Sequence, residues 1–154
     1  MEGSRYVSDF RELDVYRESR LLAKNVFEIS KGFPREEMYS LTDQIRRAAR
    51  AVGAQIAEAW AKRRYIKHFI SKLTDADGEQ LETRHWVDCA ADSGYLEESE
   101  RTQLLESLQR IGRMLNTMIS KAHLFCQDDQ RFVCEPCLHP YTVDINYTAV
   151  EKTE

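Results

Sequence analysis

The chain lacks several features that would assign it to common classes of protein. No apolar run approaches the roughly 20 residues that a membrane-spanning helix needs, and the first residues contain no secretory h-region. There is no P-loop, Gly-x-Ser-x-Gly elbow or Gly-x-Gly-x-x-Gly turn, and no segment alternates apolar and polar residues as a half-buried strand does. We therefore expect a cytoplasmic, all-α protein that is not an enzyme and needs no cofactor.

The four cysteines do not form a disulfide framework, and their scatter fits a reducing compartment. Cys134-Glu-Pro-Cys137 with His139, and Cys126 upstream, has the residue types of a zinc site. The alternative is a C-terminal segment that is unstructured or contacts a partner. We favour that alternative and expect no metal; zinc analysis of the purified protein would decide between the two.

Four stretches carry apolar residues at helical spacing. The last of them has the 4-3-4-3 spacing that is typical of knobs-into-holes packing. A chain of 154 residues with 42% hydrophobic content suffices for one core. We expect an antiparallel up-down-up-down four-helix bundle over residues 10–125, followed by an irregular tail over residues 126–154. The expected helices run from Leu13 to Lys31, from Tyr39 to Arg63, from Ile66 to Asp92 and from Glu98 to Phe125.

The second expected helix has two distinct faces. Its core stripe consists of apolar residues, and its opposite face begins with arginines and continues with small residues that allow another backbone to approach. We therefore predict an oligomer interface on the small residues, while noting that alanine is also simply a good helix former. Ser40 and Asp43 form a loose capping box at its start. The core stripe is Ile45, Ala48, Val52, Ile56 and Ala59, and the predicted interface is Gly53, Ala54, Ala57 and Ala61.

Charge is distributed unevenly along the chain. Residues 43–72 contain eight Lys or Arg and two acids, a net formal charge of +6, whereas residues 75–106 contain two Arg and ten acids, a net of −8. A basic segment of this kind is typical of a surface that binds nucleic-acid phosphates, with aromatic rings nearby for stacking. It can also face the acidic segment of a neighbouring subunit, or be ordinary solvated surface. The predicted nucleic-acid-binding residues are Arg46, Arg47, Arg50, Lys62, Arg63, Arg64 and Lys67, with Trp60, Tyr65 and His68 as stacking candidates.

A single Glu82-x-x-His85 step raises the question of a di-iron site. Such bundles need this step on two helices and a carboxylate from each of the other two. Since no second step exists, we interpret Glu82 as a carboxylate bonded to a neighbouring helix and predict no metal in the bundle.

A set of short motifs gives the chain a family resemblance. Gln44-Ile-Arg-Arg-Ala-Ala, Ile56-Ala-Glu58, Leu81-Glu-Thr83 and Gly94-Tyr-Leu96, in this order and spacing, resemble the bacterial intervening-sequence proteins, which are named for reading frames inside 23S ribosomal RNA genes. That family is related to the accessory variability proteins of diversity-generating retroelements. The resemblance covers about residues 10 to 125.

The resemblance implies a four-helix protomer that assembles as a homopentameric barrel and binds RNA or DNA through basic surface. In the retroelement branch it also implies a reverse transcriptase partner, so an adaptor for that enzyme is the alternative function. By position, Arg46 and Arg47 match the family's basic residues, and Glu58 and Glu82 match its structural acids. Gly53-Ala-Gln55 departs from the family's usual Pro-Ser-Asn step at that place.

Overall fold

The computed structural model describes residues 7–126, and these residues form four long helices and three single turns of 3-10 helix. The predicted tail therefore lies outside the described residues, except for Cys126. No strand occurs between residues 7 and 126, and none of the helices there has the length and hydrophobicity needed to cross a bilayer. The helices are α1 (Asp14–Ser30), α2 (Leu41–Ala61), α3 (Ile66–Asp92) and α4 (Glu98–Ser120), and the short turns are η1 (Phe10–Glu12), η2 (Arg35–Glu37) and η3 (Ala122–Leu124).

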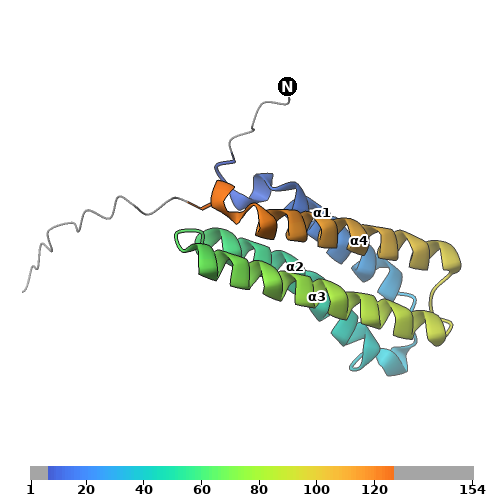
Figure 1. Cartoon of the computed structure of the whole chain (residues 1–154). Helices are drawn as coiled ribbons and strands as arrows, with labels where there is room; N and C mark the ends of the chain where they lie inside the picture. Colours follow the sequence, from blue (N-terminus) through green and yellow to red (C-terminus); the bar gives the residue numbers. More distant parts are fainter. Residues whose placement is uncertain (1–6, 127–154) are drawn as a thin grey trace, which may run out of the picture.

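The four helices form an antiparallel up-down-up-down bundle, which confirms the predicted fold (Figure 1). Each helix packs against two others: α1 contacts α2 and α4, and α3 contacts α2 and α4. Connections of ten, four and five residues reverse the chain after α1, α2 and α3, so consecutive helices are neighbours in space.

The predicted apolar stripes form the core. On α2 every residue of the predicted stripe is buried, from Ile45 to Ala59, and on α4 the buried positions run from Leu104 to Met118 at the expected spacing. Phe69 of α3 is completely buried and stacks on Phe125, with ring centroids 5.9 Å apart. This contact closes the core at the end of the bundle where α3 begins.

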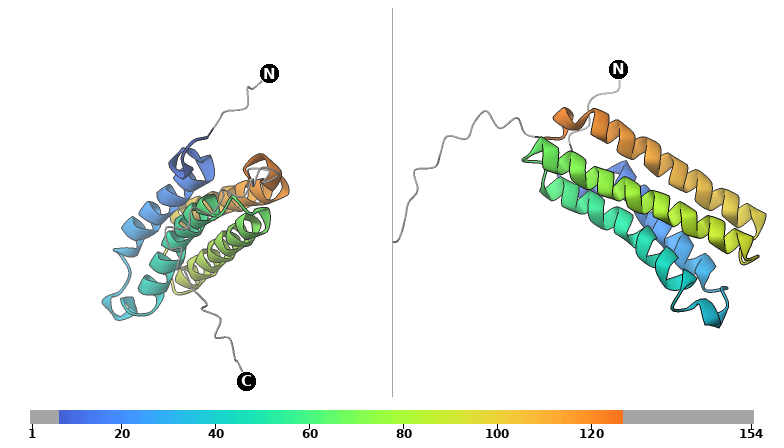
Figure 2. Two further views of the ribbon diagram at one scale, coloured as in Figure 1. Left: turned by 90° about the vertical axis from the view of Figure 1, so that its left-hand side faces the viewer. Right: turned by 60° about the horizontal axis from the view of Figure 1, so that its bottom comes forward.

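The two ends of the bundle (Figure 2) are formed by different connecting segments. The first, which we call the α2–α3 end, consists of the turn Lys62–Tyr65 together with η1 and η3. The second, the α3–α4 end, consists of residues 31–40, which contain η2, and residues 93–97. There the Tyr95 hydroxyl donates to Glu37 Oε1 at 3.3 Å, and the turn passes through Gly94, whose φ of 73° favours glycine.

Helix ends depart from the prediction by a few residues. Ser40 does not cap α2, because its hydroxyl bonds to the carboxylate and the carbonyl of Glu37 instead. The capping box belongs to α4: Glu97 accepts from the backbone three residues on, and its own N–H donates to Glu100 Oε2 at 3.0 Å. The fourth helix also ends at Ser120, before η3, rather than continuing to Phe125.

Candidate nucleic-acid interface

The turn between α2 and α3 presents Lys62, Arg63 and Arg64 on a fixed backbone, and the fourth predicted binding residue of this region, Lys67, lies in the first turn of α3. The Lys62 N–H donates to the carbonyls of Glu58 and Ala59, both at 3.0 Å, and the Tyr65 N–H donates to the Lys62 carbonyl at 3.0 Å. The Tyr65 carbonyl then accepts from two N–H groups of the first turn of α3. Only four residues separate the two helices, so the turn has little freedom to move.

The cationic side chains of this turn point to solvent, with one exception. Lys62, Arg64 and Lys67 are exposed. Arg63 is half-buried: its guanidinium lies 4.1 Å from the centroid of the Trp60 ring and donates to the Trp60 carbonyl at 2.8 Å. Trp60 therefore has a ring face covered from within the protein.

The fold adds two basic residues to this end that were not among the predicted ones. Lys121 and His123 follow α4, are exposed, and lie at the α2–α3 end because η3 packs on α3 (Figure 1). The up-down topology places the end of the fourth helix beside the turn between the second and the third. The sequence therefore held a usable signal for these residues, namely a Lys and a His at the close of the last helix.

The arginines at the start of α2 lie elsewhere. Between Arg46 and Lys62 the helix advances about 24 Å at 1.5 Å per residue, so the structure does not bring the two halves of the predicted patch together. Arg46 Nε donates to Ser30 Oγ at 2.7 Å, and its guanidinium lies 4.9 Å from the centroid of the Phe27 ring. Arg46 thus helps to hold α2 against the end of α1.

The other two arginines of that group remain at the surface. Arg47 is exposed and makes an ion pair with Asp43 at 3.6 Å within the same helix. Arg50 is exposed as well, with its guanidinium 5.9 Å from the Phe27 ring centroid.

Lys72, which contributes to the net charge of the basic segment, is occupied. Its Nζ lies 3.0 Å from Glu58 and 3.2 Å from Asp75, and it donates to Gln55 at 3.2 Å. The hydrogen bonds to these two carboxylates raise the pKa of Lys72 above its ordinary value. The residue joins α2 to α3 and is not available to a phosphate.

The α3–α4 end is acidic, and several cations near it are neutralised by acids. Arg101 pairs with Asp88 at 3.2 Å and with Glu98 at 3.8 Å. At Glu37 the Ser40 hydroxyl and a backbone N–H hold the carboxyl pKa below its usual value. The bundle is therefore polarised along its long axis: the α3–α4 end is acidic, and at the α2–α3 end Lys62, Arg64, Lys67 and Lys121 outnumber Asp9 and Glu12 at η1.

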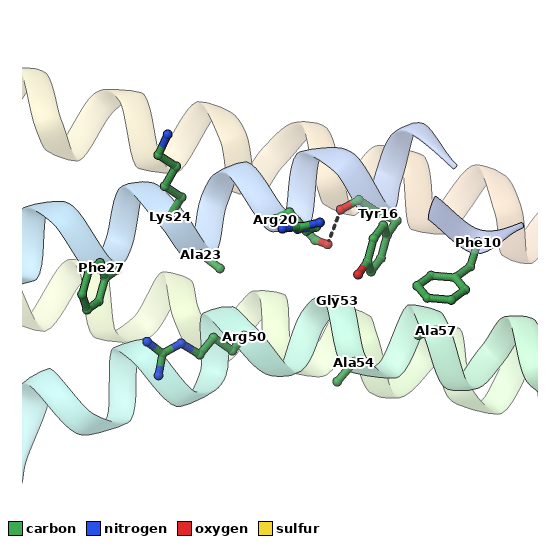
Figure 3. Close-up of a pocket in the computed structure, with 11 residues that line it drawn as sticks. Phe10, Tyr16, Arg20, Ala23, Lys24, Phe27, Arg50, Gly53, Ala54 and Ala57 are labelled. Carbon is green, nitrogen blue, oxygen red and sulfur yellow. Dashed lines mark hydrogen bonds between the residues drawn. The ribbon is translucent and has the colours of Figure 1, made fainter. Parts of the chain in front are cut away.

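A groove of about 550 Å³ runs between α1 and α2 and contains most of the predicted oligomer interface (Figure 3). Gly53 faces α1: an ideal Cβ at Gly53 would lie 3.0 Å from Ser19 Oγ, so the missing side chain lets α1 approach closely. Ala57 is half-buried in the groove, and Ala54 is exposed on its α2 side. Ala61 is exposed at the last turn of α2, outside the groove.

Glu82 and Cys126 are two of the residues that were considered as metal ligands from the sequence. Glu82 is exposed and accepts a hydrogen bond at 3.1 Å from Trp86 Nε1 on its own helix, so the prediction that it bonds to a neighbouring helix is wrong. The four-residue spacing along α3 brings this indole within reach. No group of three or more His, Cys, Asp or Glu in residues 7–126 could hold a metal ion. Of the four zinc candidates only Cys126 is described: it is half-buried, which raises the pKa of its thiol.

An antiparallel four-helix bundle with a basic end and an acidic end defines this chain as a small helical-bundle protein with a polarised surface. Residues 11–117 match the family described as 23S rRNA-intervening sequence protein, and the chain belongs to that family. No curated protein matches it.

One solved structure supports the fold independently. It is a protein of unknown function from the S23 ribosomal protein family of Bacteroides thetaiotaomicron, with a TM-score of 0.63 and 24% identity. The match covers 69% of this chain and 95% of that one. At this identity the likeness concerns the fold alone. The family resemblance expected from the motifs is thus confirmed, whereas the relation to retroelement proteins stays a prediction.

Proposed function

We propose that this protein is a non-enzymatic, oligomeric scaffold that binds RNA through the phosphate backbone at the α2–α3 end. The observation that carries the proposal is the gathering of exposed basic residues from the α2–α3 turn, the start of α3 and the segment after α4 at one end of a bundle whose other end is acidic. Membership in a family named for 23S ribosomal RNA supports RNA as the ligand.

The charge environment favours phosphate binding at this end. None of the ion pairs among residues 7–126 includes Lys62 or Lys67. No acid occurs between Ala59 and Thr74 in the sequence. A phosphate that approaches these lysines therefore displaces no internal carboxylate, and each contact releases a counterion from the RNA.

Assembly would multiply such contacts. A few lysines per protomer bind weakly, but copies of the same end that are held together act at high effective concentration. The groove between α1 and α2 offers a place for a neighbouring copy, because its floor includes small residues and its rim carries the exposed cations Arg20, Lys24 and Arg50. These rim cations would attract the acidic residues of α3 in a neighbouring copy. The family resemblance predicts five copies.

Two matched double variants test the binding site. Lys62→Ala/Lys67→Ala removes two unpaired cations at the α2–α3 end, and Lys31→Ala/Arg47→Ala removes two exposed, ion-paired cations near the other end. We expect the first variant to weaken binding to a single-stranded RNA and to lower the slope of log K against log salt by about 1.4 for each copy that contacts the RNA, at about 0.7 per phosphate contact. The second should change the slope by less than about 0.3.

Equal slopes for the wild type and Lys62→Ala/Lys67→Ala, or RNA binding that is indifferent to salt, would refute the proposed site. If Lys31→Ala/Arg47→Ala lowers the salt slope more than Lys62→Ala/Lys67→Ala does, RNA binds near the start of α2 and the proposed site is wrong. Assembly is measured separately by light scattering, where Ala54→Glu should lower the mass of the oligomer because Ala54 is exposed in the groove and its replacement does not disturb the core.

A further inference from the structure

Tyr65 is a large aromatic residue that the core does not use. The residue is 54% exposed, and it is absent from the apolar residues that pack on the core. Phe69 and Phe125 close the core at this end without it. The exposure of Tyr65 therefore has no explanation in the packing of residues 7–126.

The position of the Tyr65 ring is nevertheless well defined. The residue precedes the first turn of α3, and its own N–H and carbonyl are both hydrogen-bonded, as described for the turn. Its ring lies 5.5 Å from that of His68, with the two planes inclined by 47°. A base that stacks on Tyr65 would meet a platform whose backbone is already ordered, so binding would cost little conformational entropy there.

The three aromatic residues predicted for stacking are not equivalent. Trp60 is half-buried and has Arg63 over its ring, whereas Tyr65 is exposed. Lys62 and Lys67 lie three residues before and two residues after Tyr65 and are both exposed. This arrangement combines an aromatic surface with cations on each side along the chain, as proteins that bind single strands do.

From this arrangement we propose that the α2–α3 end selects unpaired nucleotides, with one base stacked on the ring of Tyr65 and the flanking phosphates on Lys62 and Lys67. The inference rests on the proposed function and adds the class of RNA. Bases inside a duplex are covered by their neighbours, so only a single strand, a loop or a bulge can present a base face to the ring. Phosphate contacts alone would not distinguish the two forms.

The test measures binding of a labelled single-stranded RNA and of a blunt duplex of the same length, by fluorescence anisotropy at one salt concentration. The variants are Tyr65→Ala, Tyr65→Phe and, as a matched control, Tyr39→Ala. Tyr39 is 91% exposed and lies next to the acidic η2 at the other end of the bundle. A single-stranded DNA of the same sequence serves as a further probe.

We expect Tyr65→Ala to weaken single-strand binding by about fivefold to a hundredfold, the range for loss of one stacked base, with less than a twofold change for the duplex. Tyr65→Phe should keep most of the affinity because it retains the ring, and Tyr39→Ala should match the wild type. Stacking predicts a similar loss with single-stranded DNA.

The inference is overturned if Tyr65→Ala leaves single-strand binding unchanged, or if it weakens single-strand and duplex binding by the same factor. In either case the proposed function stands as long as Lys62→Ala/Lys67→Ala still weakens both. If the wild-type protein binds neither form, the proposed function itself fails. Thermal unfolding of Tyr65→Ala checks that the bundle is intact.

Discussion

Replacing Gly53 by alanine should expose how closely α1 and α2 approach. An added Cβ would lie 3.0 Å from Ser19 Oγ and 3.7 Å from Tyr16 Cε2. The Ser19 hydroxyl already donates to the Tyr16 carbonyl at 2.7 Å, and Ser19 is only 1% exposed. The new methyl group would therefore press on a buried hydroxyl that is held in place.

Two opposing effects set the magnitude. Alanine in place of a mid-helix glycine stabilises by roughly 0.5–1 kcal/mol. If the hydroxyl moves away, its hydrogen bond is lost and a buried polar group is left without a partner, which costs about 1–3 kcal/mol. We expect Gly53→Ala to range from neutral to about 2 kcal/mol less stable than the wild type.

Gly78 supplies the matched control, because a Cβ added there meets nothing within 4 Å. Gly78→Ala should gain the full helix propensity of about 0.5–1 kcal/mol. Urea unfolding followed by circular dichroism, at one protein concentration for all variants, gives the free energies. In a Ser19→Ala/Gly53→Ala double-mutant cycle, the double variant should be more stable than the sum of the two single changes predicts, because removal of the Ser19 hydroxyl makes room for the new methyl group. The reasoning is refuted if Gly53→Ala and Gly78→Ala stabilise equally and the coupling is zero within about 0.3 kcal/mol.

Three further predictions concern stability. Arg46→Lys should lower the free energy of unfolding by about 1 kcal/mol, because an ammonium cannot reproduce both the Nε–H donation to Ser30 and the planar contact with the Phe27 ring. Urea unfolding of the variant and the wild type measures this difference. The hydrogen bond from Ser40 lowers the pKa of Glu37 in the folded protein below the unfolded value of about 4.5. The ionised carboxylate therefore stabilises the fold above about pH 4.5, and this stabilisation is lost as the pH falls through the folded pKa. Glu37→Gln should lose less free energy of unfolding than the wild type between about pH 6 and 3, and equal losses in the two proteins would contradict this. Phe69→Ala should cost about 3–5 kcal/mol, measured in the same way, and a cost below about 1 kcal/mol would show that this ring is not in the core.

The fold could be predicted from the sequence because every helix carries its own periodic stripe. Burial of these apolar stripes against one another is the largest favourable contribution to folding, and the 3.6-residue period reports the buried face directly. The same signal says little about helix ends. After Ser120 the chain continues into η3, and Phe125 packs on Phe69, a contact between residues 56 positions apart that no local pattern reports.

The candidate site could be predicted only in part. The summed charge of residues 43–72 ignores the length of the helix, along which Arg46 and Lys62 are about 24 Å apart. It also omits Lys121 and His123, which lie at this end because η3 packs on the start of α3. Lys72 was counted as positive surface, although two carboxylates neutralise it.

Gly53 illustrates the same limit in packing. Its place on the face opposite the core stripe indicated a contact with another backbone, and the structure supplies one inside the protomer, with α1. A single helix pattern identifies a face that must be approached closely. It does not say whether the approaching helix belongs to the same chain.

The polarity of the protomer must come from its side chains. In an antiparallel bundle the dipoles of neighbouring helices oppose one another, so each end combines two helix N-termini with two C-termini and the backbone contributes little net field. The basic residues at the α2–α3 end include Lys62 and Lys67, which are exposed and take no part in the core. The proposed binding and the folding therefore depend on different residues, and Lys62 and Lys67 can be replaced without loss of the bundle. This separation is what makes a failure of RNA binding in Lys62→Ala/Lys67→Ala interpretable as loss of the site rather than loss of the fold.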